Sequence, residues 1–265
     1  MPMVKVNDIN IYYESHGKGE ALILISQPGS DSSEWKMHIP VFSKAYRVIA
    51  FDNRGSGRSD KPDMPYSIEM EADDTVGLMD ALGVEKAHVL GVSGAGAIAQ
   101  NVAYKYPERV KGLILLATML KMPAKNIFVV DALAKLMNEE CSQESLIRAM
   151  WPWVLSNRFF ENPAIVEVAI KASLANSNPM PAYVFARQSA ALTDFDSRPW
   201  AGRITAPTLV LAGEDDVSLP MHYSRELAEA IPGAKFVSMS GGHMFNAENP
   251  IVFQNAVMEF LEAVI

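Results

Sequence analysis

Short apolar segments alternate with amphipathic segments along the first half of this chain and again along its last quarter. Residues 21–26 and 110–118 are continuous apolar runs, as found in strands that are buried on both faces of a sheet. Between them, residues 67–82 place apolar side chains mainly at helical spacing, and Gly83 supplies a C-terminal stop. Strands that alternate with helices form a mostly parallel sheet covered on both faces. The pattern therefore predicts an α/β fold.

The alternation is interrupted once. Residues 119–203 contain no comparable buried strand but several helical stretches rich in methionine and aromatic residues. We therefore predict a core domain formed by residues 1–118 and 204–265, with a helical cap, 119–203, inserted between core strands. The predicted strands are 4–6, 10–14, 21–26, 46–52, 87–92, 110–118, 207–212 and 235–239, and the predicted core helices are 67–82, 95–106, 220–231 and 250–265.

The amino-acid composition argues against several classes of partner and ligand. The 265 residues carry a formal charge of −8, so the average field repels nucleic-acid phosphates and anionic lipids. The only cysteine, Cys141, excludes an internal disulfide and a cysteine-rich zinc site. The N-terminus lacks a secretory signal pattern, and no apolar stretch approaches the roughly 20 residues that cross a bilayer. We expect a cytoplasmic protein without nucleic-acid or membrane partners. The sequence does not indicate an oligomeric state.

Ser93 lies in the glycine-rich segment 91–96, between a predicted strand and the helix that follows. A serine at such a junction sits on a sharp, strained turn that exposes its hydroxyl at the edge of the sheet. Its neighbours two positions away must be small, and Gly91 and Ala95 are. The usual pattern has glycine where Ala95 stands, with Gly96 next here, so the departure is mild. Ser93 is the candidate nucleophile.

A serine nucleophile needs a base within hydrogen-bonding reach and an acid that orients this base. Among the five histidines we select His243, which follows two glycines directly after the last strand, at the same predicted edge as Ser93. The remaining four occupy positions typical of surface or structural histidines: His16 in an early turn, His38 in a helix, His88 in a strand and His222 near a helix start.

The acid is expected in segment 213–220, which leaves a strand at the same edge and contains three adjacent carboxylates, Glu214, Asp215 and Asp216. We select Asp216, because it lies three positions after Gly213 and Pro220 starts the next helix. An acid directly after strand 110–118 is the other known arrangement, but residues 119–125 contain no carboxylate. The chain order is then Ser93, Asp216, His243.

Five segments together point to one family: 27–30 with Trp35, 51–60, the turn at Ser93, 213–220, and 241–243. In these segments the chain resembles the α/β-hydrolase superfamily over nearly its whole length. Within it, the chain is most similar to small cap-bearing esterases and lactonases such as 3-oxoadipate enol-lactonase and aminoacrylate hydrolase. The resemblance implies the α/β-hydrolase fold and a catalytic triad of Ser93, Asp216 and His243 that needs no metal or organic cofactor.

The resemblance also implies an oxyanion hole built from the backbone N–H groups of Gln27 and Gly94. Relatives usually carry His-Gly before this loop, whereas this chain has Ile25-Ser26. Glycine turns with an Asp–Arg pair usually hold their own loop together, so we interpret Asp52 and Arg54 in segment 51–60 as structural.

The expected function is hydrolysis of a small carboxylic ester or lactone, acyl-homoserine lactones included, through an acyl-enzyme. Haloalkane dehalogenases and epoxide hydrolases of this fold carry an aspartate at the position of Ser93, so both activities are excluded. Hydrolysis of a carbon–carbon bond in meta-cleavage-type diketones uses the same three residue types and stays open as the second function. A small-molecule receptor with slow turnover is a third.

Overall fold

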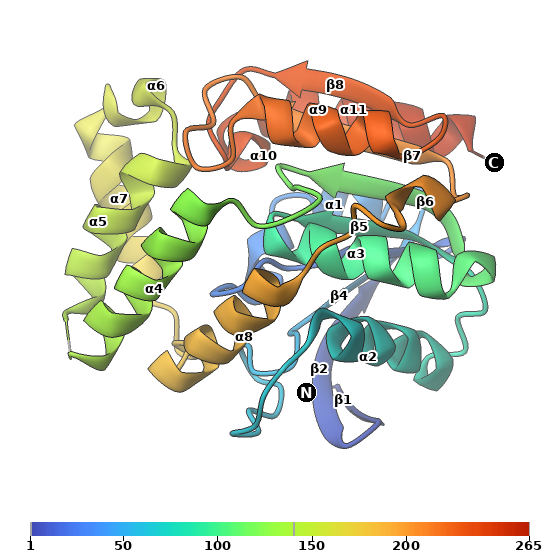
Figure 1. Cartoon of the computed structure of the whole chain (residues 1–265), viewed down its shortest axis with the longest axis horizontal. Helices are drawn as coiled ribbons and strands as arrows, with labels where there is room; N and C mark the ends of the chain where they lie inside the picture. The colour runs from blue at the N-terminus through green and yellow to red at the C-terminus, as the bar shows by residue number, and fades with distance from the viewer. Residues whose placement is uncertain (1, 140, 265) are drawn as a thin grey trace.

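The structure is a computed structural model that describes residues 2–139 and 141–264. A central sheet carries helices on both faces, and further helices lie beyond the carboxyl ends of its parallel strands (Figure 1). The strands are β1 (Met3–Val6), β2 (Ile9–His16), β3 (Ala21–Ile25), β4 (Arg47–Phe51), β5 (Ala87–Val92), β6 (Val110–Leu116), β7 (Thr208–Gly213) and β8 (Lys235–Met239). The helices are α1 (Ile39–Phe42), α2 (Ile68–Ala81), α3 (Gly94–Lys105), α4 (Ala124–Asn138), α5 (Gln143–Val154), α6 (Asn157–Phe160), α7 (Pro163–Leu174), α8 (Ala182–Asp194), α9 (Met221–Ala230), α10 (Phe245–Glu248) and α11 (Pro250–Ala263).

The eight strands form one sheet in the order β1-β2-β4-β3-β5-β6-β7-β8. The strands β1, β2 and β4 pair antiparallel, and all pairs from β4 to β8 are parallel. The predicted α/β-hydrolase fold is therefore confirmed. Because parallel strands end at the same edge, the loops after β3, β5, β7 and β8 meet there.

The sheet separates two apolar clusters, which explains why its central strands are mostly apolar. In β3, Ile23 and Ile25 face one cluster, whereas Leu22 and Leu24 face the other. Successive side chains of a strand point to opposite faces. One face is covered by α2, α3 and α9, and the other by α1 and α11 (Figure 1). A strand between two covered faces has few positions for a polar side chain.

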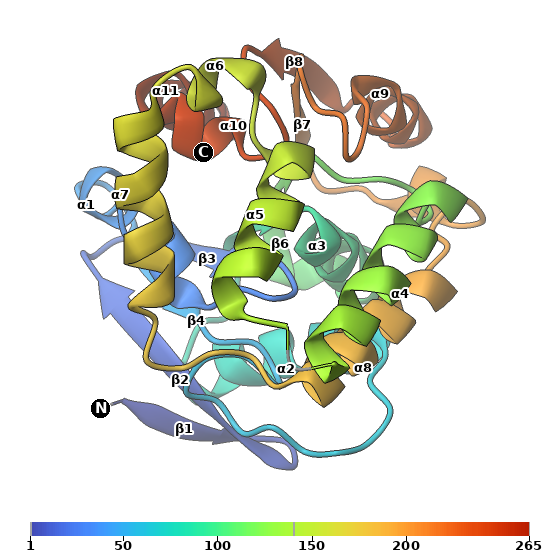
Figure 2. The same ribbon diagram turned by 90° about the vertical axis from the view of Figure 1, so that its left-hand side faces the viewer.

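The segment between β6 and β7 contains the helices α4 to α8. Figures 1 and 2 show α4, α5 and α7 beyond the carboxyl ends of the parallel strands, with α8 beside α4. Helix α8 packs against the sheet domain, because Val184 and Leu192 are buried in the same cluster as α3. The amide of Gln188 donates to the carbonyl oxygen of Arg54 at 3.0 Å. These contacts hold α8 against the sheet domain.

Several sequence expectations differ in detail. His16, expected in a turn, is the last residue of β2. His38, expected in a helix, is the residue that precedes α1. The short helix α10 was missed because one turn of helix is too short for a periodic pattern. The last helix ends at Ala263, and Ile265 lies outside the described residues. None of the helices described by the structure combines the length and apolarity needed to traverse a bilayer.

Candidate active site

Ser93 joins β5 to α3 with φ 53° and ψ −123°, a conformation that L-residues rarely adopt. The N–H of Ser93 donates to the Leu116 carbonyl oxygen at 2.8 Å, which ties the turn to β6. A side chain at Gly91 would overlap the carbonyl oxygen of Ala95 and lie 2.9 Å from the Cβ of Ala99. The glycine is therefore required by the sharpness of the turn. The small side chain of Ala95 is accommodated and fully buried.

His243 and Asp216 come from the loops that follow β8 and β7. The Nε2 atom of His243 lies 2.8 Å from the Ser93 Oγ, and the Nδ1 atom lies 2.7 Å from Asp216 Oδ2. The second carboxylate oxygen, Oδ1, accepts the N–H groups of Ser218 and Leu219, each at 2.8 Å. Both His243 and Asp216 are almost fully buried. The structure thus brings together the three side chains that the sequence selected.

The neighbouring carboxylates point elsewhere. Glu214 and Asp215 are exposed, and Glu214 accepts the hydroxyl of Ser238 at 2.9 Å. Two of the other histidines are buried on the sheet domain. His38 packs edge-on against Phe253, and burial lowers the pKa of its imidazole to about 4. Burial also lowers the pKa of His88, which lies 3.3 Å from Glu20.

The loop after β3 differs from the expected arrangement of donors. The N–H of Gln27 donates to Glu34 Oε2 at 3.2 Å, and its side-chain amide donates to Glu34 Oε1 at 2.9 Å. Burial raises the pKa of the Glu34 carboxyl to about 7, although hydrogen bonds from Gln27 and Ser30 oppose this. The next residue, Pro28, has no N–H to offer. Gly94 is the first residue of α3, so its N–H has no acceptor within the helix.

A cavity of about 130 Å³ opens above Ser93 and His243. Its walls come from the loop after β3, from α4, α5 and α8, and from the loop after β7. The apolar part of the wall includes Met119, Leu133, Met150, Trp153, Phe185 and Leu192. An apolar cavity of about 150 Å³ holds a molecule of benzene's size. The space therefore suits a small acyl group or ring, in keeping with the methionine and aromatic residues of segment 119–203.

Comparison with known proteins assigns the family. The sequence profile of the α/β hydrolase fold matches residues 20–142. A protein of Azorhizobium caulinodans that carries the name carbamate hydrolase RutD is 31% identical over 264 residues, which is 98% of each chain. The chain belongs to the α/β-hydrolase family.

Two enol-lactonases are also close relatives of this α/β hydrolase. The 3-oxoadipate enol-lactonase 2 of Acinetobacter baylyi is 30% identical, covering 94% of this chain and 92% of the relative. The crystal structure of the enol-lactonase from Burkholderia xenovorans LB400 superposes with a TM-score of 0.90 at 28% identity, covering 98% of this chain and 100% of the other. The similarity therefore spans the segment between β6 and β7 as well as the sheet domain.

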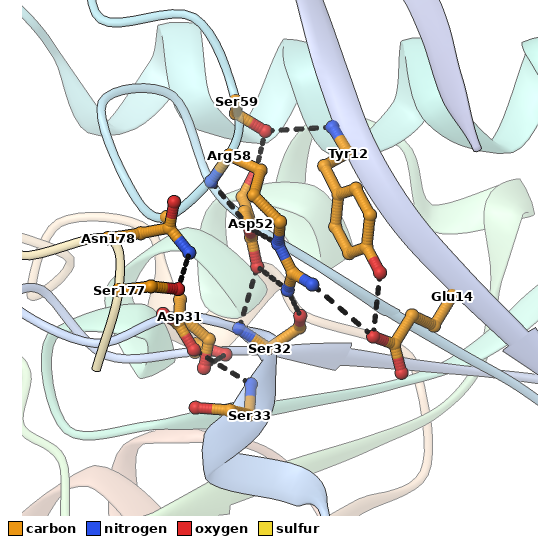
Figure 3. Close-up of polar contacts among 12 residues, drawn as sticks. Tyr12, Glu14, Asp31, Ser32, Ser33, Asp52, Arg58, Ser59, Ser177 and Asn178 are labelled. Atoms are coloured by element: carbon orange, nitrogen blue, oxygen red, sulfur yellow. Dashed lines mark hydrogen bonds and ion pairs between the residues drawn. The ribbon is translucent and has the colours of Figure 1, made fainter. Parts of the chain in front are cut away.

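Segment 51–60 of this α/β hydrolase is held by its own charged side chains. The Asp52 carboxylate accepts the Ser32 N–H at 2.8 Å and the Arg58 Nε–H at 2.9 Å, and Arg58 lies over the ring of Tyr12 (Figure 3). Arg54 is buried and donates to Asp74 Oδ2 at 2.8 Å. These contacts connect segment 51–60 to β2, to α2 and to the loop after β3. None of them involves Ser93 or the cavity.

Sequence reasoning missed two polar groups of this α/β hydrolase. Glu34 bonds to Gln27 next to the catalytic candidates, and Lys125 of α4 lines the cavity. Neither residue belongs to a recognisable motif. Helix α4 also carries Asp131 and Lys135, so no sequence signal distinguished Lys125. Among residues 2–139 and 141–264, no three His, Cys, Asp or Glu side chains gather in a way that could hold a metal ion.

Proposed function

We propose that this α/β hydrolase is a serine hydrolase that cleaves carboxylic esters or lactones through an acyl-enzyme. In this mechanism Ser93 attacks the carbonyl carbon while His243 Nε2 accepts the hydroxyl proton. Asp216 keeps the proton of the neutral imidazole on Nδ1 and stabilises the imidazolium that forms. The imidazolium then protonates the leaving oxygen. In the second half, His243 removes a proton from water, which releases the acid and restores Ser93.

The oxygen of the tetrahedral intermediate needs donors that face its position. We assign this role to the N–H groups of Gly94 and Gln27. The Gly94 N–H belongs to the first turn of α3, whose dipole also favours negative charge. To bind this oxygen, the Gln27 N–H must break its 3.2 Å hydrogen bond to Glu34 Oε2 or share its proton between the two acceptors. A carboxyl with a pKa of about 7 is partly protonated near neutral pH, and a neutral carboxyl competes less strongly for the donor.

The single observation that carries the proposal is the hydrogen-bonded chain from Ser93 through His243 to Asp216 at the base of an apolar cavity. The full-length relatives named as enol-lactonases support the lactone half of the assignment, and the one named as a carbamate hydrolase supports acyl transfer to water. The cavity volume favours short acyl groups or small rings over long chains.

The test is hydrolysis of short p-nitrophenyl esters and γ-lactones by the wild-type protein and by Ser93→Ala. Replacing the nucleophile removes the acyl-enzyme route, so we expect a loss of at least about 10⁴-fold in kcat. The variant removes one half-buried hydroxyl and keeps a small side chain in the turn, so its urea unfolding should match the wild type. Wild-type turnover by Ser93→Ala would refute the proposal.

The same panel separates the two other functions. Turnover of a dienone meta-cleavage product above that of every ester and lactone would favour a carbon–carbon hydrolase. A rate far below one turnover per minute on all substrates, together with a ligand-dependent rise in Tm, would favour a receptor.

A further inference from the structure

Lys125 is the one lysine or arginine among the described residues that line the cavity. The remaining polar groups of the wall are neutral hydroxyls and amides, such as those of Ser189, Ser218 and Asn126. A protein with a formal charge of −8 repels anions on average. Lys125 is exposed, so its ammonium group at the mouth of an apolar cavity is a local exception to the charge of the whole molecule.

Two contacts hold the ammonium group at the rim. The Nζ of Lys125 donates to the Val217 carbonyl oxygen at 3.1 Å, next to Asp216 in the chain. It also lies 4.7 Å from the centre of the Trp153 ring, which lines the same cavity. The neighbouring Asn126 donates to the Ser218 carbonyl oxygen at 3.0 Å, so the first turn of α4 is docked on the loop after β7. These contacts position the lysine against the cavity.

The charge of Lys125 is not neutralised by a carboxylate among the residues that the structure describes. Two of the other lysines of the segment between β6 and β7 are paired: Lys135 with Asp131 at 2.7 Å, and Lys121 with Asp196 at 3.4 Å. An ammonium group has three N–H donors, and the Val217 carbonyl accepts one of them. The remaining donors are available to an anion in the cavity mouth. The N-terminal end of α4 adds a field of the same sign.

We propose that Lys125 binds a carboxylate of the substrate, so that the preferred ester or lactone carries an ionised carboxyl group besides the bond that is cleaved. This specificity role rests on the proposed hydrolase function. The ammonium forms a charge-assisted hydrogen bond to the substrate carboxylate while the uncharged part of the substrate occupies the apolar cavity. Lys125 takes no part in bond cleavage, so it acts on KM more than on kcat.

The experiment compares an anionic and a neutral substrate of similar length, p-nitrophenyl hydrogen glutarate and p-nitrophenyl valerate. We expect Lys125→Met to lower the ratio of their kcat/KM values about tenfold, mainly through KM of the anionic ester, which corresponds to about 1.4 kcal/mol. Lys125→Arg should retain most of the ratio. The preference of the wild type should weaken as salt rises from low to high ionic strength.

Lys135→Met is the matched control, because it removes the same charge from the same helix outside the cavity lining. We expect it to leave kcat/KM for both substrates unchanged. The proposal is overturned if Lys125→Met leaves the ratio of the kcat/KM values unchanged, lowers kcat/KM equally for both substrates, or has the same effect as Lys135→Met.

Binding to a protein without the nucleophile tests Lys125 separately from turnover. Calorimetry with monomethyl glutarate on Ser93→Ala should show binding that is weakened about tenfold when Lys125→Met is added. Absent or unchanged binding refutes the role of Lys125. A wild type that binds the anion through Lys125 but hydrolyses neither ester would refute the hydrolase function alone.

Discussion

Replacing Asp216 with asparagine should disable the candidate site by locking His243 in the wrong tautomer. In the wild type, Oδ1 accepts two backbone N–H groups, from Ser218 and Leu219, at 2.8 Å each. In Asp216→Asn the amide oxygen must take that place, because an NH₂ group there would face two donors. The amide nitrogen then faces His243 Nδ1, which must accept. The imidazole proton is forced onto Nε2, so this atom loses the lone pair that would accept the Ser93 proton.

The size of the effect follows from these contacts. Turning the amide around would break two hydrogen bonds worth about 1 kcal/mol each, or about 2 kcal/mol together. Roughly 1 molecule in 30 would then hold the productive tautomer. The variant also lacks the negative charge that stabilises the imidazolium. Together we expect a fall in kcat of about 10³ to 10⁴-fold, or about 4 to 5 kcal/mol of transition-state stabilisation.

The assay is steady-state hydrolysis of a short p-nitrophenyl ester near neutral pH, with urea unfolding as the check on folding. Asp215→Asn is the control, because Asp215 is exposed and its N–H, rather than its side chain, binds the Gly241 carbonyl oxygen. It should keep kcat within about twofold of the wild type. A folded Asp216→Asn protein with kcat within tenfold of the wild type would refute the tautomer argument.

Three further predictions concern stability and substrate size. Burial, with a smaller contribution from a neighbouring carboxylate, raises the pKa of Glu71 to about 8 from 4.5. The folded state therefore keeps a proton that the unfolded state releases, and stability is lost as pH rises from 4.5 to 8. In urea unfolding, the wild type should lose about 3 kcal/mol more than Glu71→Gln between pH 5.5 and 8, whereas Glu69→Gln, at an exposed site of the same helix, should follow the wild type. Gly91→Ala should lower the free energy of unfolding by about 3 kcal/mol, because the added methyl overlaps backbone. Trp153→Ala should move the optimum in a series of p-nitrophenyl esters toward longer acyl chains, because it removes an indole from the cavity wall.

Each of these has a direct contradicting result. Equal pH dependence in wild type and Glu71→Gln would show that the carboxyl is ionised when folded. A Gly91→Ala protein of wild-type stability would show that the turn relaxes without cost. An unchanged acyl preference in Trp153→Ala would place the acyl group away from α5.

The sequence predicted the sheet domain closely because its signals are local. Strands β5 and β8 have the predicted bounds, 87–92 and 235–239, since continuous apolar residues or alternation end there at turn-forming residues. The position of Ser93 followed from the requirement for small residues around a tight turn, and those of Asp216 and His243 from loops that leave strands at one edge of the sheet. These inferences need only neighbouring residues and the rule that parallel strands end at a common edge.

Other features depend on which distant segments meet. The side chain of Gln27 contacts Met244, 217 positions away, and the Gln27 N–H bonds to Glu34 rather than standing free. Lys125 is an ordinary helix residue in sequence, and only the docking of α4 against the loop after β7 brings it to the cavity. The sequence alone therefore determined the α/β layering and the order and identity of the candidate triad, because periodicity and turn chemistry are written within a few residues. The tertiary structure alone decided the hydrogen-bond partner of the Gln27 N–H, the cavity size and the placement of the one lysine among the described lining residues, because burial and contact between remote segments have no local pattern.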